Sequence, residues 1–257
     1  MYAPERTPAR RTALVRRPGP RLAEGIAPGA AAPVDTDLAR RQHDAYVAAL
    51  RAAGWTVHEV EPADDHPDAV FVQDALVVRG DVAVVTRPGA PARRGETAGA
   101  EKAARDLGLR VERVTAPATL DGGDVLQAGG VVYVGRTART NEDGTCALAH
   151  LLGDGPVVPV AAPDVLHLKS AMTALPDGTL FGRPEHVATA GLPGVRVAPE
   201  PTGAHVLVTG PRHVLLAASA PRTAALLAAE GLDVTTVEIG EFQKLGGSVT
   251  CLSVLIP

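Results

Sequence analysis

Apolar residues recur at helical spacing in four stretches of the chain. In residues 37–55, Tyr46 and Leu50 fall near one face, and Gly54 follows as a residue suited to end a helix. The other three stretches share this amphipathic pattern and cover 95–109, 141–155 and 220–232. At the start of one of them, Asn141 is the expected N-cap, followed by acidic residues in the first turn. The pattern therefore predicts four helices.

Between these helices, short β-rich runs occur in pairs, and the pairs resemble one another. Each pair has a polar residue, an apolar run, a glycine-containing turn, a second apolar run and a polar loop that leads into a helix. The clearest copies cover 74–91, 124–141 and 205–222, and 167–186 is a weaker copy with an Asp-Gly turn. Four similar units separated by some tens of residues are typical of an internally repeated fold.

The two ends of the chain supply the halves of a fifth unit. Residues 11–20 (RTALVRRPGP) match the second half of a unit, and residues 248–256 (SVTCLSVLI) match the first half. Pairing of the first strand with the last would close a ring, leave no free sheet edge and hold both ends of the chain. A mixed α/β sheet with helices on its faces remains the alternative when periodicity alone is considered.

The composition describes an ordinary globular protein. The 257 residues are 46% hydrophobic and 21% charged, with a formal net charge of -4. This balance supports a buried core and offers no basic surface for nucleic acid. The longest apolar stretch, 213–232, is interrupted by Pro221 and Arg222 and cannot span a membrane. Because the N-terminus also lacks the apolar segment of a signal peptide, we expect a cytoplasmic protein.

Two cysteines, Cys146 and Cys251, need separate explanations. A disulfide between them is an alternative, but we expect reduced thiols in the cytoplasm. Cys146 falls within a predicted helix, so we interpret it as a small buried hydrophobic residue. Cys251 stands close to the end of the chain, between a Gly-Gly-Ser sequence and a short apolar run.

Polar residues gather where the predicted strands begin: Asp74, Asp121, Asp124, His167 and Cys251. In a closed ring of units these positions would converge on the central axis. A thiol, an imidazole and a carboxylate are the components of a nucleophilic triad. Taken singly, each has a structural explanation, such as an Asx turn for the aspartates or packing for the thiol. Common nucleotide, zinc-hydrolase and serine-hydrolase motifs are missing from the sequence.

Six longer motifs occur along the chain. They are FVQDALVV (71–78), TRPGAPARRGE (86–96), LDGGDVL (120–126), YVGRTARTN (133–141), VLHLKS (165–170) and GGSVTCLSVL (246–255). In order and spacing they resemble the motifs of dimethylarginine dimethylaminohydrolases, which belong to the guanidino-group-modifying enzymes. The resemblance covers nearly the whole chain and implies an α/β fold in which one domain, residues 1–257, forms a five-bladed α/β propeller. That fold agrees with the ring of five repeats.

The resemblance also implies a reaction and the residues that perform it. The reaction is hydrolysis of an N-omega-methylated arginine to citrulline and an amine through a covalent cysteine thiouronium, with no metal or other cofactor. Cys251 matches the nucleophile, His167 the acid and base, and Asp121 the carboxylate that orients the imidazole. Asp124 matches a supporting position. The implied substrate-binding positions are Leu22, Asp68, Gln73, Asp74, Arg87, Arg139 and Leu245.

Within that set the resemblance implies a division of the substrate among the residues. Asp74 corresponds to the acid that binds the guanidinium, and Asp68 to the acid that receives the α-ammonium group. Arg87 and Arg139 correspond to the pair that binds the α-carboxylate. The remaining two positions, Leu22 and Leu245, line the site through their backbone carbonyls. The expected partner is therefore a small guanidino substrate; a homodimer is compatible with the sequence, which does not specify the oligomeric state.

One position departs from the family pattern. Where the family usually has FVED, this chain has FVQD, so Gln73 replaces an acid near the expected guanidinium site. Glutamine keeps a hydrogen-bond acceptor but loses the charge that attracts a cation. The substitution either tunes the pocket to another guanidine substituent or is tolerated at a partly solvated position, and we favour the second interpretation.

Three other functions share some of these residues. Arginine deiminases use the same triad on unsubstituted arginine, but they carry a helical insertion for which this chain is too short. They also place an acid where this chain has Lys169. Amidinotransferases pass the same thiouronium to an amine and are usually longer. A non-catalytic arginine-binding protein would have no need of Cys251, His167 and Asp121 together, so we expect an enzyme.

Overall fold

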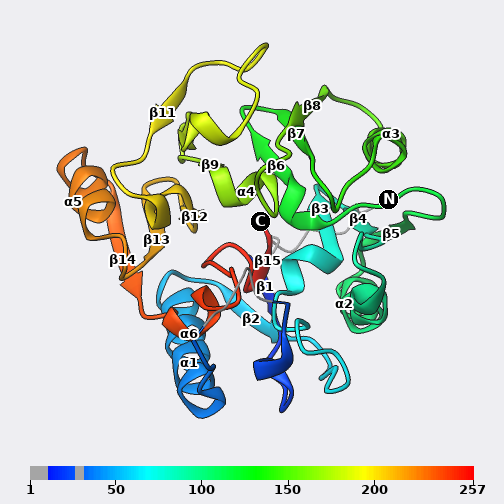
Figure 1. The fold of residues 1–257 in the computed structure, drawn as a ribbon, viewed down its shortest axis with the longest axis horizontal. Helices are drawn as coiled ribbons and strands as arrows, with labels where there is room; N and C mark the ends of the chain where they lie inside the picture. The colour runs from blue at the N-terminus through cyan, green and yellow to red at the C-terminus, as the bar shows by residue number, and fades with distance from the viewer. Residues whose placement is uncertain (1–10, 27–31) are drawn as a thin grey trace, which may run out of the picture.

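The fold is that of a computed structural model, which describes residues 11–26 and 32–257. Within these residues, five three-stranded sheets surround a common axis (Figure 1). In every sheet the inner strand is antiparallel to the middle strand, and the middle strand is parallel to the outer strand. The predicted five-bladed α/β propeller is therefore confirmed.

From inner to outer strand, the blades are β15 (Ser253–Ile256), β1 (Thr12–Val15) and β2 (Thr56–Glu59); β3 (Leu76–Arg79), β4 (Val82–Val85) and β5 (Arg110–Arg113); β6 (Val125–Ala128), β7 (Val131–Arg136) and β8 (Val157–Ala161); β9 (Met172–Ala174), β10 (Leu180–Gly182) and β11 (Val195–Val197); and β12 (Leu207–Val208), β13 (His213–Ala217) and β14 (Asp233–Val237).

Four longer helices lie at the periphery of the ring and connect the middle strand of a blade to its outer strand (Figure 1). All four were predicted from apolar spacing, and they are α1 (Thr36–Ala52), α2 (Thr97–Asp106), α3 (Glu142–Leu152) and α5 (Pro221–Ala229). Two single-turn helices, α4 (Leu168–Ala171) and α6 (Gly240–Gln243), precede inner strands. The 3-10 turns are η1 (Leu22–Glu24), η2 (Val72–Ala75), η3 (Pro91–Glu96), η4 (Gly122–Asp124), η5 (Pro184–His186) and η6 (Pro201–Ala204).

The fourth blade explains why its repeat was the weakest in the sequence. Between β10 and β11 the chain forms the short turn η5 and a loop instead of a long helix. This connection contains Pro184 and Pro193, and Gly191 adopts φ +83°. Prolines that lack an N–H and a glycine in the left-handed region interrupt helical hydrogen bonding.

Local sequence signals define the ends of the helices. The Asp35 side chain accepts a hydrogen bond from Leu38 N at the start of α1, and Gly54 follows its end at φ +85°. The Asn141 side chain accepts from Gly144 N, so the predicted N-cap of α3 is confirmed. Cys146, by contrast, is exposed, and the prediction that it is buried was wrong. The buried face of α3 includes Leu148, and a residue two positions away on a helix points to a different face.

The first and last strands close the ring, as predicted. β1 pairs with β15 antiparallel, from Thr12 opposite Ile256 to Val15 opposite Ser253. Tyr46 of α1 holds this junction, because its hydroxyl donates to Val249 O at 2.9 Å and lies 2.7 Å from Ser253 Oγ. The strand begins only at Ser253, so the part of the predicted strand that includes Cys251 is a turn.

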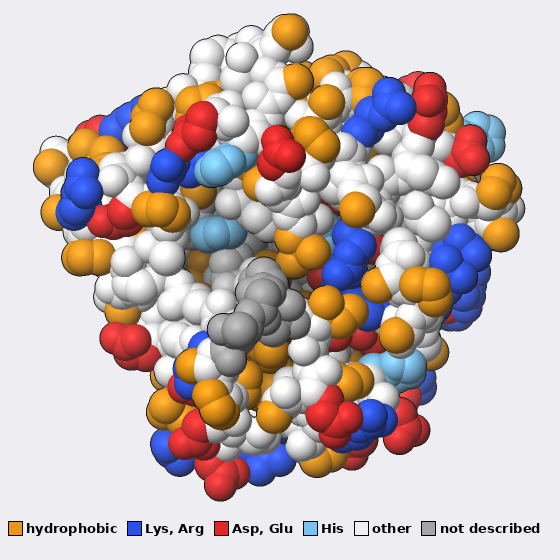
Figure 2. Space-filling view, viewed as in Figure 1, with side chains coloured by type: hydrophobic (Ala, Val, Ile, Leu, Met, Phe, Trp, Pro, Cys, Tyr) orange, Lys and Arg blue, Asp and Glu red, His pale blue; other side chains and the backbone are white. Residues whose placement is uncertain are grey.

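The five inner strands enclose a cavity along the axis of the ring. Its volume is about 470 Å³, and residues of β3, β6, β9, β12 and β15 line it. The apolar cores lie between neighbouring blades: one cluster joins Val84 of β4, Val134 of β7 and Leu148 of α3. On the face shown in Figure 2, basic and acidic side chains are interspersed around the rim. In the described part of the chain, no helix has the length and apolar character that crossing a bilayer requires.

Ring closure generates a prediction about the last strand. Truncation after Leu252 removes β15, which exposes the buried edge of β1 and deletes Ser253, a partner of Tyr46. We expect the truncated chain to lose its cooperative thermal unfolding transition in circular dichroism. A control chain that lacks only the exposed Pro257 should keep its midpoint. A transition of the truncated chain within about 5 °C of the full chain would show that closure is dispensable.

Candidate active site

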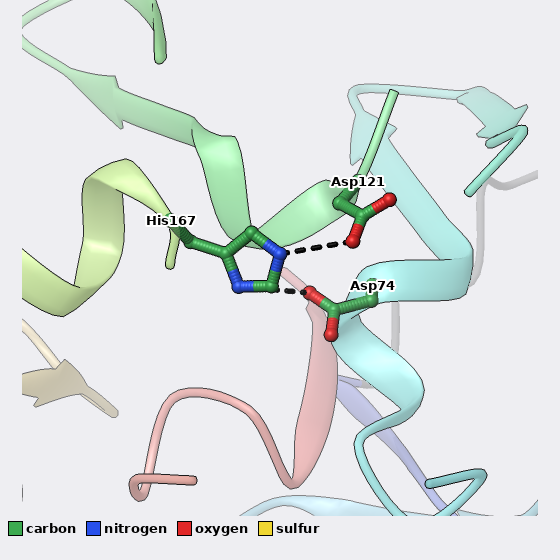
Figure 3. Close-up of side chains that lie close together, drawn as sticks. All are labelled: Asp74, Asp121 and His167. Atoms are coloured by element: carbon green, nitrogen blue, oxygen red, sulfur yellow. Dashed lines mark hydrogen bonds and ion pairs between the residues drawn. The ribbon is translucent and has the colours of Figure 1, made fainter. Parts of the chain in front are cut away.

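The loops that precede the inner strands meet at one end of the ring axis. Asp74 comes from η2, Asp121 from the residue before η4, His167 from the residue before α4, and Cys251 from the turn before β15. Because every blade presents the start of its inner strand to this end, residues far apart in sequence converge there. Figure 3 shows Asp74 and Asp121 beside the His167 ring, each joined to it by a dashed line. One pocket is lined by Asp68, Asp74, Arg139, His167, Leu245 and Cys251, all of which the sequence predicted.

His167 is held between two carboxylates. Its Nε2 donates to Asp121 Oδ2 at 2.9 Å, and its Nδ1 lies 3.8 Å from Asp74 Oδ1. The imidazole is buried, with 4% of the residue exposed. Burial alone would lower the pKa of His167, but the charges of Asp74 and Asp121 and the hydrogen bond outweigh it, so the pKa is raised. The imidazole therefore keeps its second proton at a pH where a free histidine has lost it.

Asp121 is fully buried and its carboxylate is fixed from three sides. Oδ1 accepts from Gly89 N at 2.8 Å, and Oδ2 accepts from His167 and lies 3.4 Å from Arg139 Nη1. The backbone N of Asp121 donates to Thr140 Oγ1. These contacts leave the carboxylate little freedom to rotate, so it can set the orientation of the imidazole.

The two glycines of the DGGD motif allow the loops to pack this closely. A Cβ at Gly122 would lie 2.0 Å from Gln73 O, and a Cβ at Gly123 would lie 2.6 Å from His167 Nδ1. Gly123 N also donates to Asp74 Oδ1 at 2.9 Å. The motif therefore brings a backbone donor and a histidine against the same carboxylate, which a side chain would prevent.

Asp124 faces away from the pocket and supports the loops around it. It accepts hydrogen bonds from Leu168 N and from the hydroxyls of Thr137 and Thr140, at 2.6–2.8 Å. Burial raises the pKa of Asp124 to about 6 despite these bonds. Because Leu168 directly follows His167, the contact anchors the catalytic loop to the neighbouring blade.

Cys251 lies in the turn before β15, with its thiol in the pocket. Sγ is 3.3 Å from Ser248 Oγ, and Gly246 and Gly247 line the pocket beside it. Burial and the charge of Asp74 raise the pKa of the thiol, while Ser248 and Lys169 act in the opposite direction. The resting group is therefore a protonated thiol that a bound cation could ionise.

Arg93 is the residue that the sequence interpretation missed. Its guanidinium is buried in the pocket wall, with Nη1 2.6 Å from Asp74 Oδ2 and Nη2 2.8 Å from Glu96 Oε2. Burial raises the pKa of Asp74, but the positive charges of His167 and Arg93 outweigh it and lower that pKa to about 2. Asp74 is thus ionised and bonded to an arginine of the protein itself.

Arg87 contacts a backbone carbonyl in this structure, and its implied role at the α-carboxylate stays a prediction. Its Nη1 donates to Ala118 O at 3.0 Å, and it is not among the residues that line the pocket. Arg87 and Arg93 belong to the same motif, and β4 ends before the first while η3 contains the second. The clue that could have found Arg93 is Glu96, an acid three residues later that neutralises a buried arginine.

Three further predicted positions lie in different surroundings. Asp68 accepts from Ile26 N through both oxygens, at 3.0 and 3.2 Å, so its carboxylate faces the segment after η1. Leu22 is fully buried in the core and its carbonyl accepts from Gly25 N; it does not line the pocket. Gln73 lines the axial cavity and not the pocket. The implied roles of Leu22, through its backbone carbonyl, and of Gln73 near the guanidinium stay predictions.

Asp74, Asp121 and His167 form a group whose ligand atoms lie within 4.8 Å of one another. Such a group has the donor types of a metal site. Here both carboxylates already bind cationic side chains, Arg93 and Arg139 respectively. A metal ion would have to share the carboxylates with these charges, so the arrangement favours proton transfer by His167.

Comparisons with known proteins agree with this geometry. No family profile matches the chain. The chain is 54% identical to an N(G),N(G)-dimethylarginine dimethylaminohydrolase of Streptomyces coelicolor over 94% of this chain and 95% of that protein. It is 32% identical to the Pseudomonas aeruginosa enzyme of that name over 93% of this chain and 97% of that protein.

Solved structures show the same fold. A cysteine-to-serine variant of the Pseudomonas aeruginosa enzyme in complex with citrulline is 30% identical, covers 95% of this chain and 98% of that one, and has a TM-score of 0.88. The N-terminal domain of ArgZ, a cyanobacterial arginine dihydrolase, has a TM-score of 0.86 at 21% identity over 96% and 97% of the two chains. The second likeness supports the fold alone.

The contrast between the two arginines is testable by stability. Arg93→Met leaves Asp74 and Glu96 buried without their cation, and we expect it to lower the free energy of unfolding by about 3–5 kcal/mol. Arg87→Met is the matched control, because it removes one bond to a carbonyl, and its expected cost is about 1 kcal/mol. Urea unfolding followed by fluorescence measures both. Equal losses would contradict the buried ion network around Arg93.

Proposed function

Because the chain belongs to the dimethylarginine dimethylaminohydrolase family, we propose that it hydrolyses dimethyl- or monomethyl-L-arginine to L-citrulline and dimethylamine or methylamine. The observation that carries this proposal is the single pocket in which the Cys251 thiol, the His167 imidazole and the Asp74 carboxylate face one another. A cation-binding carboxylate beside a nucleophile and a proton donor fits a guanidinium substrate. The other features of the pocket suit the amino-acid end of that substrate.

The charges around the pocket support a defined orientation of the substrate. Asp74 would bind the substrate guanidinium. Its negative charge would then be shared between the substrate and Arg93, which already contacts one oxygen of the Asp74 carboxylate. Asp68 would accept the α-ammonium group, since its carboxylate faces the pocket and now accepts only from a backbone N–H among the described residues. Arg139, with 14% of its side chain exposed, would bind the α-carboxylate. Arg87, which the resemblance pairs with Arg139, is the expected second arginine at the α-carboxylate.

In the proposed reaction, the bound guanidinium first lowers the pKa of the Cys251 thiol, which releases its proton to solvent because His167 is already protonated. The thiolate attacks the guanidinium carbon and forms a C–S bond. The His167 imidazolium then gives its proton to the leaving nitrogen, and the C–N bond breaks to release the amine. What remains is a covalent S-alkylthiouronium on Cys251. Asp121 stabilises the imidazolium before this step and keeps its orientation afterwards.

The second half of the reaction uses the same histidine in the opposite direction. Neutral His167 takes a proton from water, and the resulting hydroxide attacks the thiouronium carbon. The C–S bond breaks, the thiol is restored, and the former guanidinium carbon carries the oxygen of citrulline. The restored thiol takes the hydroxyl proton of the collapsing adduct, and His167 has regained its proton from water, so both groups return to their starting states.

The location, partners and domain organisation of the protein are inferred from the sequence. We expect a protein of the cytoplasm that binds a small guanidino substrate, and we expect residues 1–257 to act as one domain. Nucleic acid is not an expected partner, in keeping with the net charge of -4. A homodimer is the assembly that we would test first.

The proposed function is tested by citrulline release from dimethylarginine and monomethylarginine, with arginine as the competing substrate. We expect the methylated substrates to be preferred and Cys251→Ser to lower kcat at least about 10³-fold, because the nucleophile is lost. Cys146→Ser is the matched control and should keep full activity, since that thiol lies on the exposed face of α3. No citrulline from either methylated substrate would refute the substrate, and an active Cys251→Ser variant would refute the mechanism.

A further inference from the structure

Two cavities lie back to back at the catalytic end of the ring. The active-site pocket is on one side, and the axial cavity of about 470 Å³ is on the other. Three loops contribute neighbouring residues to both. Asp74, His167 and Cys251 line the pocket, whereas Gln73, Lys169 and Thr250 line the axial cavity.

The wall between the cavities is one layer of backbone. Gln73 N donates to Cys251 O at 3.3 Å, which joins the loop of the second blade to the loop of the nucleophile. The Gln73 carbonyl oxygen also packs tightly against Gly122, because a Cβ added to this glycine would lie only 2.0 Å from that oxygen. A charge at the near end of the axial cavity therefore lies on the opposite side of these loops from the thiol.

The Lys169 side chain contributes a positive charge to the lining of the axial cavity. Among the described residues its ammonium group has no carboxylate or hydrogen-bond partner, although it lines the same cavity as Gln73. The other charged residue in the lining, Asp177, lies beyond the far end of β9 in an exposed turn. The Asp177 carboxylate accepts from Thr179 N. Gln73 is neutral, and its buried Oε1 accepts no hydrogen bond.

We propose that the Lys169 ammonium group stabilises the thiolate of Cys251 from the axial side, and that the neutral residue at position 73 leaves this charge uncompensated. The thiolate then lies between two cations during the reaction, the substrate guanidinium in the pocket and Lys169 behind the wall. This inference deepens the proposed function, on which it rests. Lys169 is a positioning residue, because it acts on the nucleophile and not on the substrate.

The other charged groups near Lys169 do not replace it. Asp74 and Asp124 favour its protonated form, but burial outweighs them and lowers the pKa of Lys169 to about 8. Asp74 raises the pKa of the Cys251 thiol, whereas Lys169 lowers it. Burial lowers the pKa of His205 to about 4, so that imidazole stays neutral at physiological pH. On the pocket side, His167 is paired with carboxylates, which leaves Lys169 as the cation behind the thiol.

The test is the pH dependence of Cys251 alkylation by neutral iodoacetamide, in the full chain with Cys146→Ser to remove the exposed thiol. Near pH 7, below the pKa of about 8 of Lys169, the ammonium group is charged, and we expect Lys169→Met to slow alkylation about tenfold there. Lys169→Arg keeps the charge and should restore a rate close to that of the parent. Because alkylation requires no turnover, the result stands even if the substrate assignment fails.

A second pair of variants tests the role of position 73. Gln73→Glu gives Lys169 an internal counter-charge, and we expect it to slow alkylation about fivefold or more. Gln127→Glu adds the same charge to the axial cavity from β6, farther along the axis, and should change the rate less than twofold. An unchanged alkylation rate near pH 7 in Lys169→Met would overturn the proposal. So would equal slowing by Lys169→Met and Lys169→Arg, or by Gln73→Glu and Gln127→Glu.

Discussion

The structure depends on one electrostatic constraint, a charged imidazole held between two buried carboxylates. Asp74 and Asp121 are 3% and 0% exposed, so each charge would be costly without partners. Backbone N–H groups of Gly89 and Gly123 supply part of the compensation, and the cationic groups of His167, Arg93 and Arg139 supply the rest. The same contacts that offset the free-energy cost of burying the two carboxylates also raise the pKa of His167 and orient its ring. Stability and proton transfer thus arise from one set of bonds.

The propeller explains how such a group can be assembled from distant parts of the chain. Each blade starts its inner strand at the same end of the axis, so three blades deliver Asp74, Asp121 and His167 to one point. Cys251 directly precedes β15, so the pairing of β15 with β1 holds the turn that carries the thiol. Ring closure is therefore part of the active site as well as of the fold. The axial cavity follows from the same geometry and gives a second side from which the thiol can be influenced.

Much of this was predictable from the sequence, for identifiable reasons. Repeated strand pairs and the split unit at the termini predicted the ring, since period-2 patterns and glycine turns are local signals. The triad was predictable because its residues begin strands and match family motifs. Arg93 was not, because the curl of η3 decides which arginine of the motif turns inward. The exposure of Cys146 and the position of Gln73 behind the pocket wall also depend on packing between elements, which spacing does not specify.

The central claim is that His167 carries its second proton in the resting enzyme. Nitrogen-15 NMR of the imidazole measures this directly, with His43 and His205 as internal references whose pKa values burial lowers to about 4. We predict that His167 loses its second proton at a higher pH than an unperturbed histidine, whereas both reference rings lose theirs at a lower pH. Asp121→Asn should shift the loss of the His167 proton to lower pH. Loss of that proton in the parent enzyme at or below the pH of an unperturbed histidine would contradict the account.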